Sequence, residues 1–95
     1  MQREQIIKRI AEVKNSTHEN KLEAFSDLLL ETAKGGYIEL VTQLIQEGAA
    51  VDHADKYGST ALHYAAENGH EETVEFLIGK GATVDHADKY GSTAL

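Results

Sequence analysis

Apolar residues recur with a helical period just after the middle of the chain. Leu62, Ala65 and Ala66 are spaced at i, i+3 and i+4, which predicts a short helix with one apolar face. Thr60 stands ahead of this helix, and its hydroxyl can accept a hydrogen bond from a backbone N–H of the first turn. Gly69 can end the helix, because glycine adopts a left-handed conformation without steric cost.

A second helix is predicted over about residues 70–79. Val74, Leu77 and Ile78 repeat the same apolar spacing. The segment that follows, residues 83–90, is rich in aspartate and precedes a glycine, so we expect a turn with a short extended excursion. A single pair of helices cannot bury both apolar stripes, and neighbouring pairs must therefore stack.

A further amphipathic stretch lies near the N-terminus, over residues 2–14, and residues 15–20 are expected to form a loop. The apolar stripe of this stretch comprises Ile6, Ile7, Ile10, Ala11 and Val13. We expect this helix to cover the open end of the stacked array. The alternative is a partner-binding or coiled-coil helix, although the stripe is short for a coiled coil.

The chain repeats itself with a period of 33 residues. The segment 51–62 recurs unchanged at 84–95, which indicates duplication. The same offset, applied backwards from the segment 58–90, finds a diverged earlier copy. Matching pairs are Leu29 with Leu62, Ala33 with Ala66, Gly36 with Gly69, Val41 with Val74, Leu44 with Leu77 and Gly48 with Gly81.

The start of the complete unit carries a specific signature. Residues 58–70 read Gly-Ser-Thr-Ala-Leu-His-Tyr-Ala-Ala-Glu-Asn-Gly-His. This resembles the ankyrin-repeat pattern Gly-x-Thr-Pro-Leu-His-x-Ala-Ala-x-x-Gly-His, and residues 74–85 match the rest of that repeat. The resemblance implies an all-α ankyrin-repeat solenoid of stacked helix-turn-helix units with projecting turns. Ala61 stands where the family usually has proline, and Asp52 and Asp85 stand where asparagine is common, the residue that is hydroxylated in some members.

The resemblance and the repeat offset divide the chain into four parts. These are an N-terminal helical cap at 1–24, a diverged ankyrin-like repeat at 25–57, a second repeat at 58–90 and the start of a truncated third repeat at 91–95. In the diverged repeat, Asp27 replaces the capping threonine and Leu30 replaces the signature histidine.

The sequence stops inside a repeat, so we expect a fragment of a longer array. Stability in such arrays comes largely from the interfaces between neighbouring units. An uncovered last unit would expose Ala65 and Leu77 to solvent. Self-association through the uncapped C-terminal end is the alternative.

Charge and composition narrow the range of partners. The chain has a formal net charge of -7 and no cysteine. Residues 1–24 carry five basic and four acidic side chains, whereas residues 25–95 carry four basic and twelve acidic ones. An acidic surface repels a phosphate backbone, so we do not expect nucleic acid as a partner. No apolar run is long enough for membrane insertion, no signal peptide is evident, and a cytoplasmic location is expected.

Histidines and aspartates raise the possibility of a metal or catalytic site. Asp52-His53-x-Asp55 recurs at residues 85–88, but equivalent atoms of stacked helices lie roughly 8–10 Å apart, too far to share a metal ion. Aspartates in turns also hydrogen-bond the local backbone. The resemblance implies a structural, hydrogen-bonded His63 and a His70 that starts the second helix. We therefore expect no catalytic residue, no metal and no cofactor.

The resemblance implies that a protein partner binds the concave face formed by the projecting turns and the first helix of each pair. On this sequence the corresponding residues are Lys34, Ala54, Lys56, Tyr57, Ser59, Glu67, Asn68, Ala87, Lys89, Tyr90 and Ser92. We expect a protein–protein interaction module, such as an adaptor, without catalysis. The alternative is a targeting module of a larger enzyme or channel whose other domains lie beyond residue 95.

Two tyrosines lie beside turn glycines within this set. Tyr57 and Tyr90 each follow a lysine, Lys56 or Lys89, which would form a small basic row on an acidic domain. Tyrosine is enriched at binding hot spots. The two rings could instead pack as a ladder that supports the turns, and the sequence leaves both interpretations open.

Overall fold

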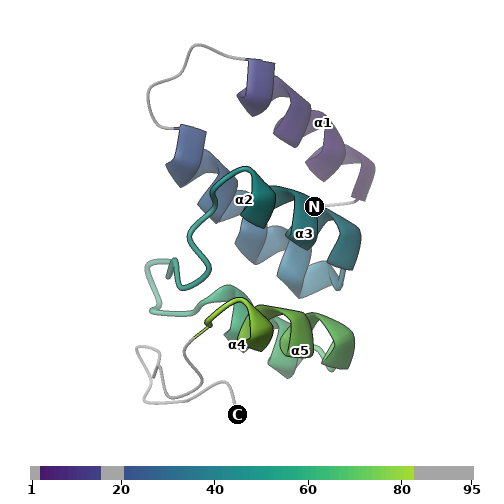
Figure 1. Ribbon diagram of the computed structural model, residues 1–95, viewed down its shortest axis with the longest axis vertical. Helices are drawn as coiled ribbons and strands as arrows, with labels where there is room; N and C mark the ends of the chain where they lie inside the picture. Colours follow the sequence, from purple (N-terminus) through teal and green to yellow (C-terminus); the bar gives the residue numbers. More distant parts are fainter. Residues whose placement is uncertain (1–2, 16–20, 83–95) are drawn as a thin grey trace.

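The computed structural model describes residues 3–15 and 21–82, and every regular element in these ranges is an α-helix. The helices are α1 (Arg3–Asn15), α2 (Lys21–Gly35), α3 (Ile38–Gln46), α4 (Ala61–Glu67) and α5 (Glu71–Gly79). The pair α2–α3 stacks on the pair α4–α5, and α1 lies across the other side of the first pair (Figure 1). The all-α architecture predicted from the repeat is confirmed.

The first helix of each pair ends in the same way. Gly36 follows α2 with a φ of 71°, and Gly69 lies at the end of α4 with a φ of 74°. In both turns the glycine N–H bonds the carbonyl three residues back, and the next N–H bonds the carbonyl five residues before it. This is the Schellman arrangement, which satisfies carbonyls that a helix end leaves unpaired. The prediction that Gly69 ends its helix is confirmed.

The start of α4 is fixed by two buried polar side chains. Thr60 is the N-cap, and its hydroxyl accepts a hydrogen bond from the backbone N–H of His63. In return the backbone N–H of Thr60 donates to Nδ1 of His63 at 3.0 Å. Thr60 and His63 are 1% and 6% exposed, so these bonds satisfy groups that water cannot reach. The capping role of Thr60 and the structural role of His63 are confirmed.

His70 connects the two repeats at their turns. It is the N-cap of α5 but makes no side-chain capping bond. Its Nε2 instead lies 3.0 Å from the backbone carbonyl oxygen of Lys34, and since a carbonyl can only accept, Nε2 donates. The imidazole covers Gly36, where an added Cβ would lie 2.5 Å from Nδ1. A glycine in the first turn therefore makes room for the histidine of the next.

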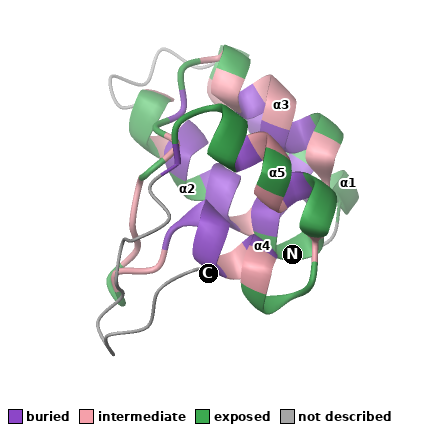
Figure 2. Cartoon of the chain, turned by 60° about the horizontal axis from the view of Figure 1, so that its bottom comes forward, coloured by how far each residue is buried: buried purple, intermediate pink, exposed green. Residues whose placement is uncertain are grey.

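One apolar core runs from α1 to α5. Its largest fully buried hydrophobic side chains are Ile6, Leu29, Val41, Leu44, Leu62 and Leu77. Ala65 and Leu77 are both 0% exposed, so the expectation that they face solvent is wrong. They belong to the same core cluster as the α2–α3 pair, on which α4 and α5 pack. Ile78 is the residue of the predicted α5 stripe that is exposed, at 39%, and Figure 2 shows buried and exposed residues alternating along α5.

Helix α1 packs on the first pair through a narrower stripe than predicted. Ile6 and Ile10 are buried and Val13 is partly buried, at i, i+4 and i+7. Ile7, at 40% exposure, and Ala11 are exposed, so their assignment to the buried stripe is wrong. Each lies one residue further along the helix, about 100° around its axis from the contact line.

Both ends of α1 are also tied to α3 and the residue that follows it. Arg3 pairs with Glu39 at 3.2 Å, and Lys14 pairs with Glu47 at 3.3 Å. Such exposed pairs contribute at most about 1 kcal/mol each, so most of the stability of this contact comes from the buried isoleucines. Helix α2 begins at Lys21 and continues without a break through the proposed division at residues 24 and 25.

Candidate functional site

The candidate site lies where α2, α4 and the segment between α3 and α4 meet. Helices α2 and α4 are the first helices of their pairs and lie side by side. Residues 47–60 leave the end of α3 and project to one side of the helical stack before α4 begins (Figure 1). Asp27, Leu30, Glu31 and Lys34 stand at i, i+3, i+4 and i+7 of α2, so they share one face of that helix.

Asp55 closes the projecting turn on itself. One carboxylate oxygen, Oδ1, accepts hydrogen bonds from the backbone N–H groups of Tyr57 at 2.9 Å and Ser59 at 3.1 Å. The backbone N–H of Asp55 donates to the Ser59 carbonyl, and that of Gly58 donates to the Asp55 carbonyl. Gly58 has a φ of 77°, a conformation that other residues rarely adopt. The turn that presents Tyr57 is therefore a closed loop.

The other oxygen of Asp55 ties this turn to α4. The Tyr64 hydroxyl donates a hydrogen bond to Oδ2 of Asp55. Burial alone would raise the pKa of the Asp55 carboxyl, but the hydrogen bonds from Tyr64, Ser59 and Tyr57 outweigh it and hold the pKa below its ordinary value of 3.8. The same bond to Asp55, with burial, raises the pKa of Tyr64 to about 12. Asp55 is therefore an anion at neutral pH with its hydrogen-bonding capacity largely used.

Two further bonds join the projecting turn to α2. Nε2 of His53 lies 2.7 Å from Oδ1 of Asp27, and the backbone N–H of Ala50 donates to the buried hydroxyl of Ser26 at 2.9 Å. Hydrogen bonds therefore join the projecting turn to both α2 and α4.

The carboxylates and histidine of the Asp52-His53-x-Asp55 motif do not converge. His53 contacts α2 and Asp55 contacts α4. Within residues 3–15 and 21–82, no group of three or more histidines and carboxylates is placed to hold a metal ion. The second copy of the motif, at residues 85–88, lies outside the described residues.

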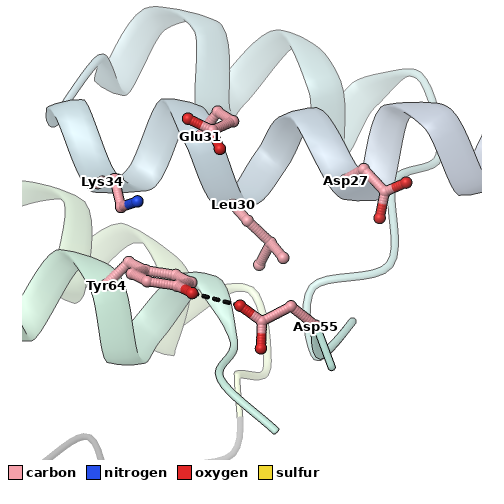
Figure 3. A pocket seen from close by; sticks show the side chains of 6 residues that line it. All are labelled: Asp27, Leu30, Glu31, Lys34, Asp55 and Tyr64. Atoms are coloured by element: carbon pink, nitrogen blue, oxygen red, sulfur yellow. Dashed lines mark hydrogen bonds between the residues drawn. The ribbon is translucent and has the colours of Figure 1, made fainter. Parts of the chain in front are cut away.

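A hollow of about 210 Å³ opens between α2, the turn and α4. It is lined by Asp27, Leu30, Glu31, Lys34, Asp55 and Tyr64 (Figure 3). Leu30 is 8% exposed and provides an apolar surface between the charged groups. The Lys34 ammonium lies 5.0 Å from the centroid of the Tyr64 ring, a cation–π contact across the two helices. The hollow therefore combines carboxylates, an aromatic face and a cation.

A family model described as ankyrin repeats (3 copies) matches residues 3–95. This chain belongs to the ankyrin-repeat family. A search of curated proteins gave no match. Ankyrin repeats are generally protein-interaction modules, and the family is typically non-catalytic. Among the described helices of this ankyrin array, none is long and apolar enough to cross a membrane.

Part of the predicted binding set lies within the described residues of the ankyrin array. Tyr57 is 41% exposed, and the Lys56 ammonium lies 5.1 Å from its ring centroid. Lys34, Glu67 and Asn68 are exposed, and the side-chain amide of Asn68 donates to the carbonyl of Tyr64. Ala54 and Ser59 are half-buried. The remaining residues of the set, Ala87, Lys89, Tyr90 and Ser92, lie outside the described residues, as does the partner ring of the proposed tyrosine ladder.

Most of the residues that line the hollow were not predicted from the sequence. Of the six residues that line it, Lys34 alone belonged to the predicted set. Tyr64 occupies the variable position between the histidine and the alanines of the ankyrin signature, on the first helix. Glu31 is its equivalent one repeat earlier. That position, together with the shared face of α2, was a signal in the sequence that could have identified both.

Proposed function

We propose that this chain is a protein-interaction module, acting as an adaptor, and that it binds a protein partner on the face formed by α2, α4 and the projecting turn. The observation that carries the proposal is an exposed tyrosine on a turn that is tied to both helices. Tyr57 is presented by the loop that Asp55 closes, and the loop is anchored through Tyr64, Asp27 and Ser26. Ordering such a turn before binding reduces the entropy lost when a partner docks.

The chemistry of the turn supports protein recognition. Tyrosine offers a large contact area and loses little side-chain entropy on binding. Lys56 covers part of the ring and keeps a positive charge beside it, on a domain that is otherwise acidic.

Substitution of Tyr57 tests this function. Tyr57→Ala is expected to reduce capture of protein partners by the immobilised chain about tenfold, the effect of losing a hot-spot aromatic residue. Quantitative mass spectrometry of the captured proteins measures the loss, and circular dichroism should show unchanged helicity. Ile7→Ala is the matched control, because Ile7 is about equally exposed but lies on α1. Equal capture by wild type and Tyr57→Ala would contradict the proposal. A Tyr57→Ala variant that unfolds would show that the ring supports the turn instead.

A further inference from the structure

The face of α2 that lines the hollow carries two carboxylates, and one of them has no partner within the described part of the chain. Asp27 and Glu31 are four residues apart in the middle of the helix, and such a like-charge pair destabilises a helix. His53 compensates Asp27. Glu31 makes no hydrogen bond or ion pair in the regions that the structure describes. A charge arrangement that costs stability without a compensating contact is expected mainly at functional sites.

The aromatic face of the hollow is held ready for a cation. The bond from the Tyr64 hydroxyl to Asp55 fixes the ring in position. Lys34, three residues after Glu31, places its ammonium over this ring at 5.0 Å and is not paired with Glu31. The ring therefore already accepts a positive charge from the chain's own side chain.

We propose that this hollow is the subsite for an arginine side chain of a basic partner segment, an inference that rests on the proposed function. The planar guanidinium would stack on the Tyr64 ring in place of the Lys34 ammonium and donate hydrogen bonds to the Glu31 carboxylate. Its aliphatic stem would lie against Leu30. Arginine fits better than lysine, because its flat, forked group both stacks on aromatic rings and pairs with carboxylates in a bidentate way.

The charge of the whole domain points to the same partner. Residues 25–95 carry twelve acidic and four basic side chains, so a basic segment is attracted to this part of the chain. The three carboxylates of the hollow come from α2 and from the projecting turn, and they outnumber its one lysine. The site thus requires the two neighbouring helices and the turn to be assembled together.

The test uses a probe of defined chemistry. N-acetyl-L-arginine methylamide, titrated into the ¹⁵N-labelled chain, is expected to shift the amide resonances of Glu31, Asp55 and Tyr64 in a saturable way. The shifts should weaken in high salt, because the charges are partly exposed. N-acetyl-L-citrulline methylamide has nearly the same shape without the charge and is expected to leave these resonances unchanged. The corresponding lysine amide should bind more weakly than the arginine amide.

Matched variants distinguish this site from a general effect of charge. Glu31→Gln is expected to weaken arginine-amide binding at least fivefold while leaving the protein at least as stable as the wild type, because it removes the like-charge pair with Asp27. Lys34→Gln removes the competing cation and should strengthen binding. Glu75→Gln is the control, because Glu75 also stands four residues after an acidic residue, Glu71, but lies on α5. Its arginine-amide binding should equal that of the wild type.

Three results would overturn the subsite. These are equal shifts with citrulline amide, equal or tighter binding of lysine amide, and unchanged binding by Glu31→Gln. The partner-capture experiment separates this failure from that of the proposed function. Capture that depends on Tyr57 but not on Glu31 would remove the arginine subsite and retain the interaction module. Capture that depends on neither residue would reject both.

Discussion

At the scale of single residues, Asp55 and Tyr64 decide how the binding face is held together. Asp55 is an acceptor for its own turn through one oxygen and for α4 through the other. The hydrogen bond between them lowers the pKa of Asp55 and raises that of Tyr64, because it favours the ionised carboxyl and the protonated phenol. Each shift makes stability depend on pH in a different range.

The direction of each dependence follows from the shift. The pKa of Asp55 lies below its ordinary 3.8, so its contribution to stability is present above pH 3.8 and is lost as the pH falls through the lower, folded pKa. The pKa of Tyr64 is raised from 10.0 to about 12, so its contribution is complete below pH 10 and is lost as the pH rises through 12. The domain is therefore most stabilised by this pair across the neutral range.

Replacing the phenol tests the pair directly. Tyr64→Phe should lower the free energy of unfolding at neutral pH by about 1.5–3 kcal/mol, the range for a hydrogen bond to a charged group. The difference from the wild type should shrink between pH 10 and 12, and urea unfolding at several pH values measures it. Tyr37→Phe is the control, since the Tyr37 hydroxyl makes no hydrogen bond in the described regions. An equal loss in the two variants, or a difference that does not change with pH, would contradict the role of the pair.

The structural role of a residue could be predicted from the sequence where it depends on near neighbours in the chain. Thr60, His63 and Gly69 have roles that depend on neighbours three to five residues away, and the repeat signature was sufficient to assign them. Asp55 and Tyr64 are nine residues apart across a turn without helical geometry, so no periodicity brings them together. Their contact depends on where the turn projects, which only the folded chain defines.

At the scale of elements, the turns between paired helices set how closely the repeats stack. Gly36 ends α2 with a positive φ, and its missing side chain leaves space that the ring of His70 fills. Gly69 has the same conformation at the end of α4, but an added Cβ there would contact none of the described residues within 4 Å. Both glycines therefore have a positive φ, but only at Gly36 would a side chain collide with a neighbouring residue of the described chain.

This difference predicts unequal effects of the same substitution. Gly69→Ala should cost about 1–2 kcal/mol of stability from backbone strain alone. Gly36→Ala should cost at least about 1 kcal/mol more, because the new methyl group displaces His70 and its bond to the Lys34 carbonyl. Thermal and urea unfolding of the two variants measure the gap. In a His70→Ala background the gap should close, and its persistence there would show that His70 is not the cause.

The helices themselves were predicted better than the faces that they bury. The i, i+3, i+4 spacing located α4 and α5 close to their observed bounds. It did not identify Ile7, Ala11 and Ile78 as exposed. Where two consecutive residues are apolar, the spacing alone does not show which of them faces the neighbouring helices. That choice depends on how the helix crosses the pair beneath it.

At the scale of the whole molecule, the array is a row of layers in which each contacts its neighbours. Helix α1 contacts the α2–α3 pair, and that pair contacts α4–α5. In such stacks stability is approximately the sum of the units and of the interfaces between them. The role of α1, as a cap or as a separate partner-binding helix, thus depends on whether its interface stabilises the layers beyond it.

Substitutions on two adjacent isoleucines distinguish these roles. Ile6 is 0% exposed in the contact with the first pair, so Ile6→Ala should lower the free energy of unfolding by about 2–5 kcal/mol. Ile7 is 40% exposed, and Ile7→Ala should change it by no more than about 0.5 kcal/mol. Tyrosine fluorescence is a suitable readout, because none of the four tyrosines lies in α1. If α1 is a cap, Ile6→Ala should move the fluorescence transition to lower urea concentration together with the loss of helicity. A fluorescence transition unchanged by Ile6→Ala would show that the repeats fold without α1 and would favour the partner-binding helix.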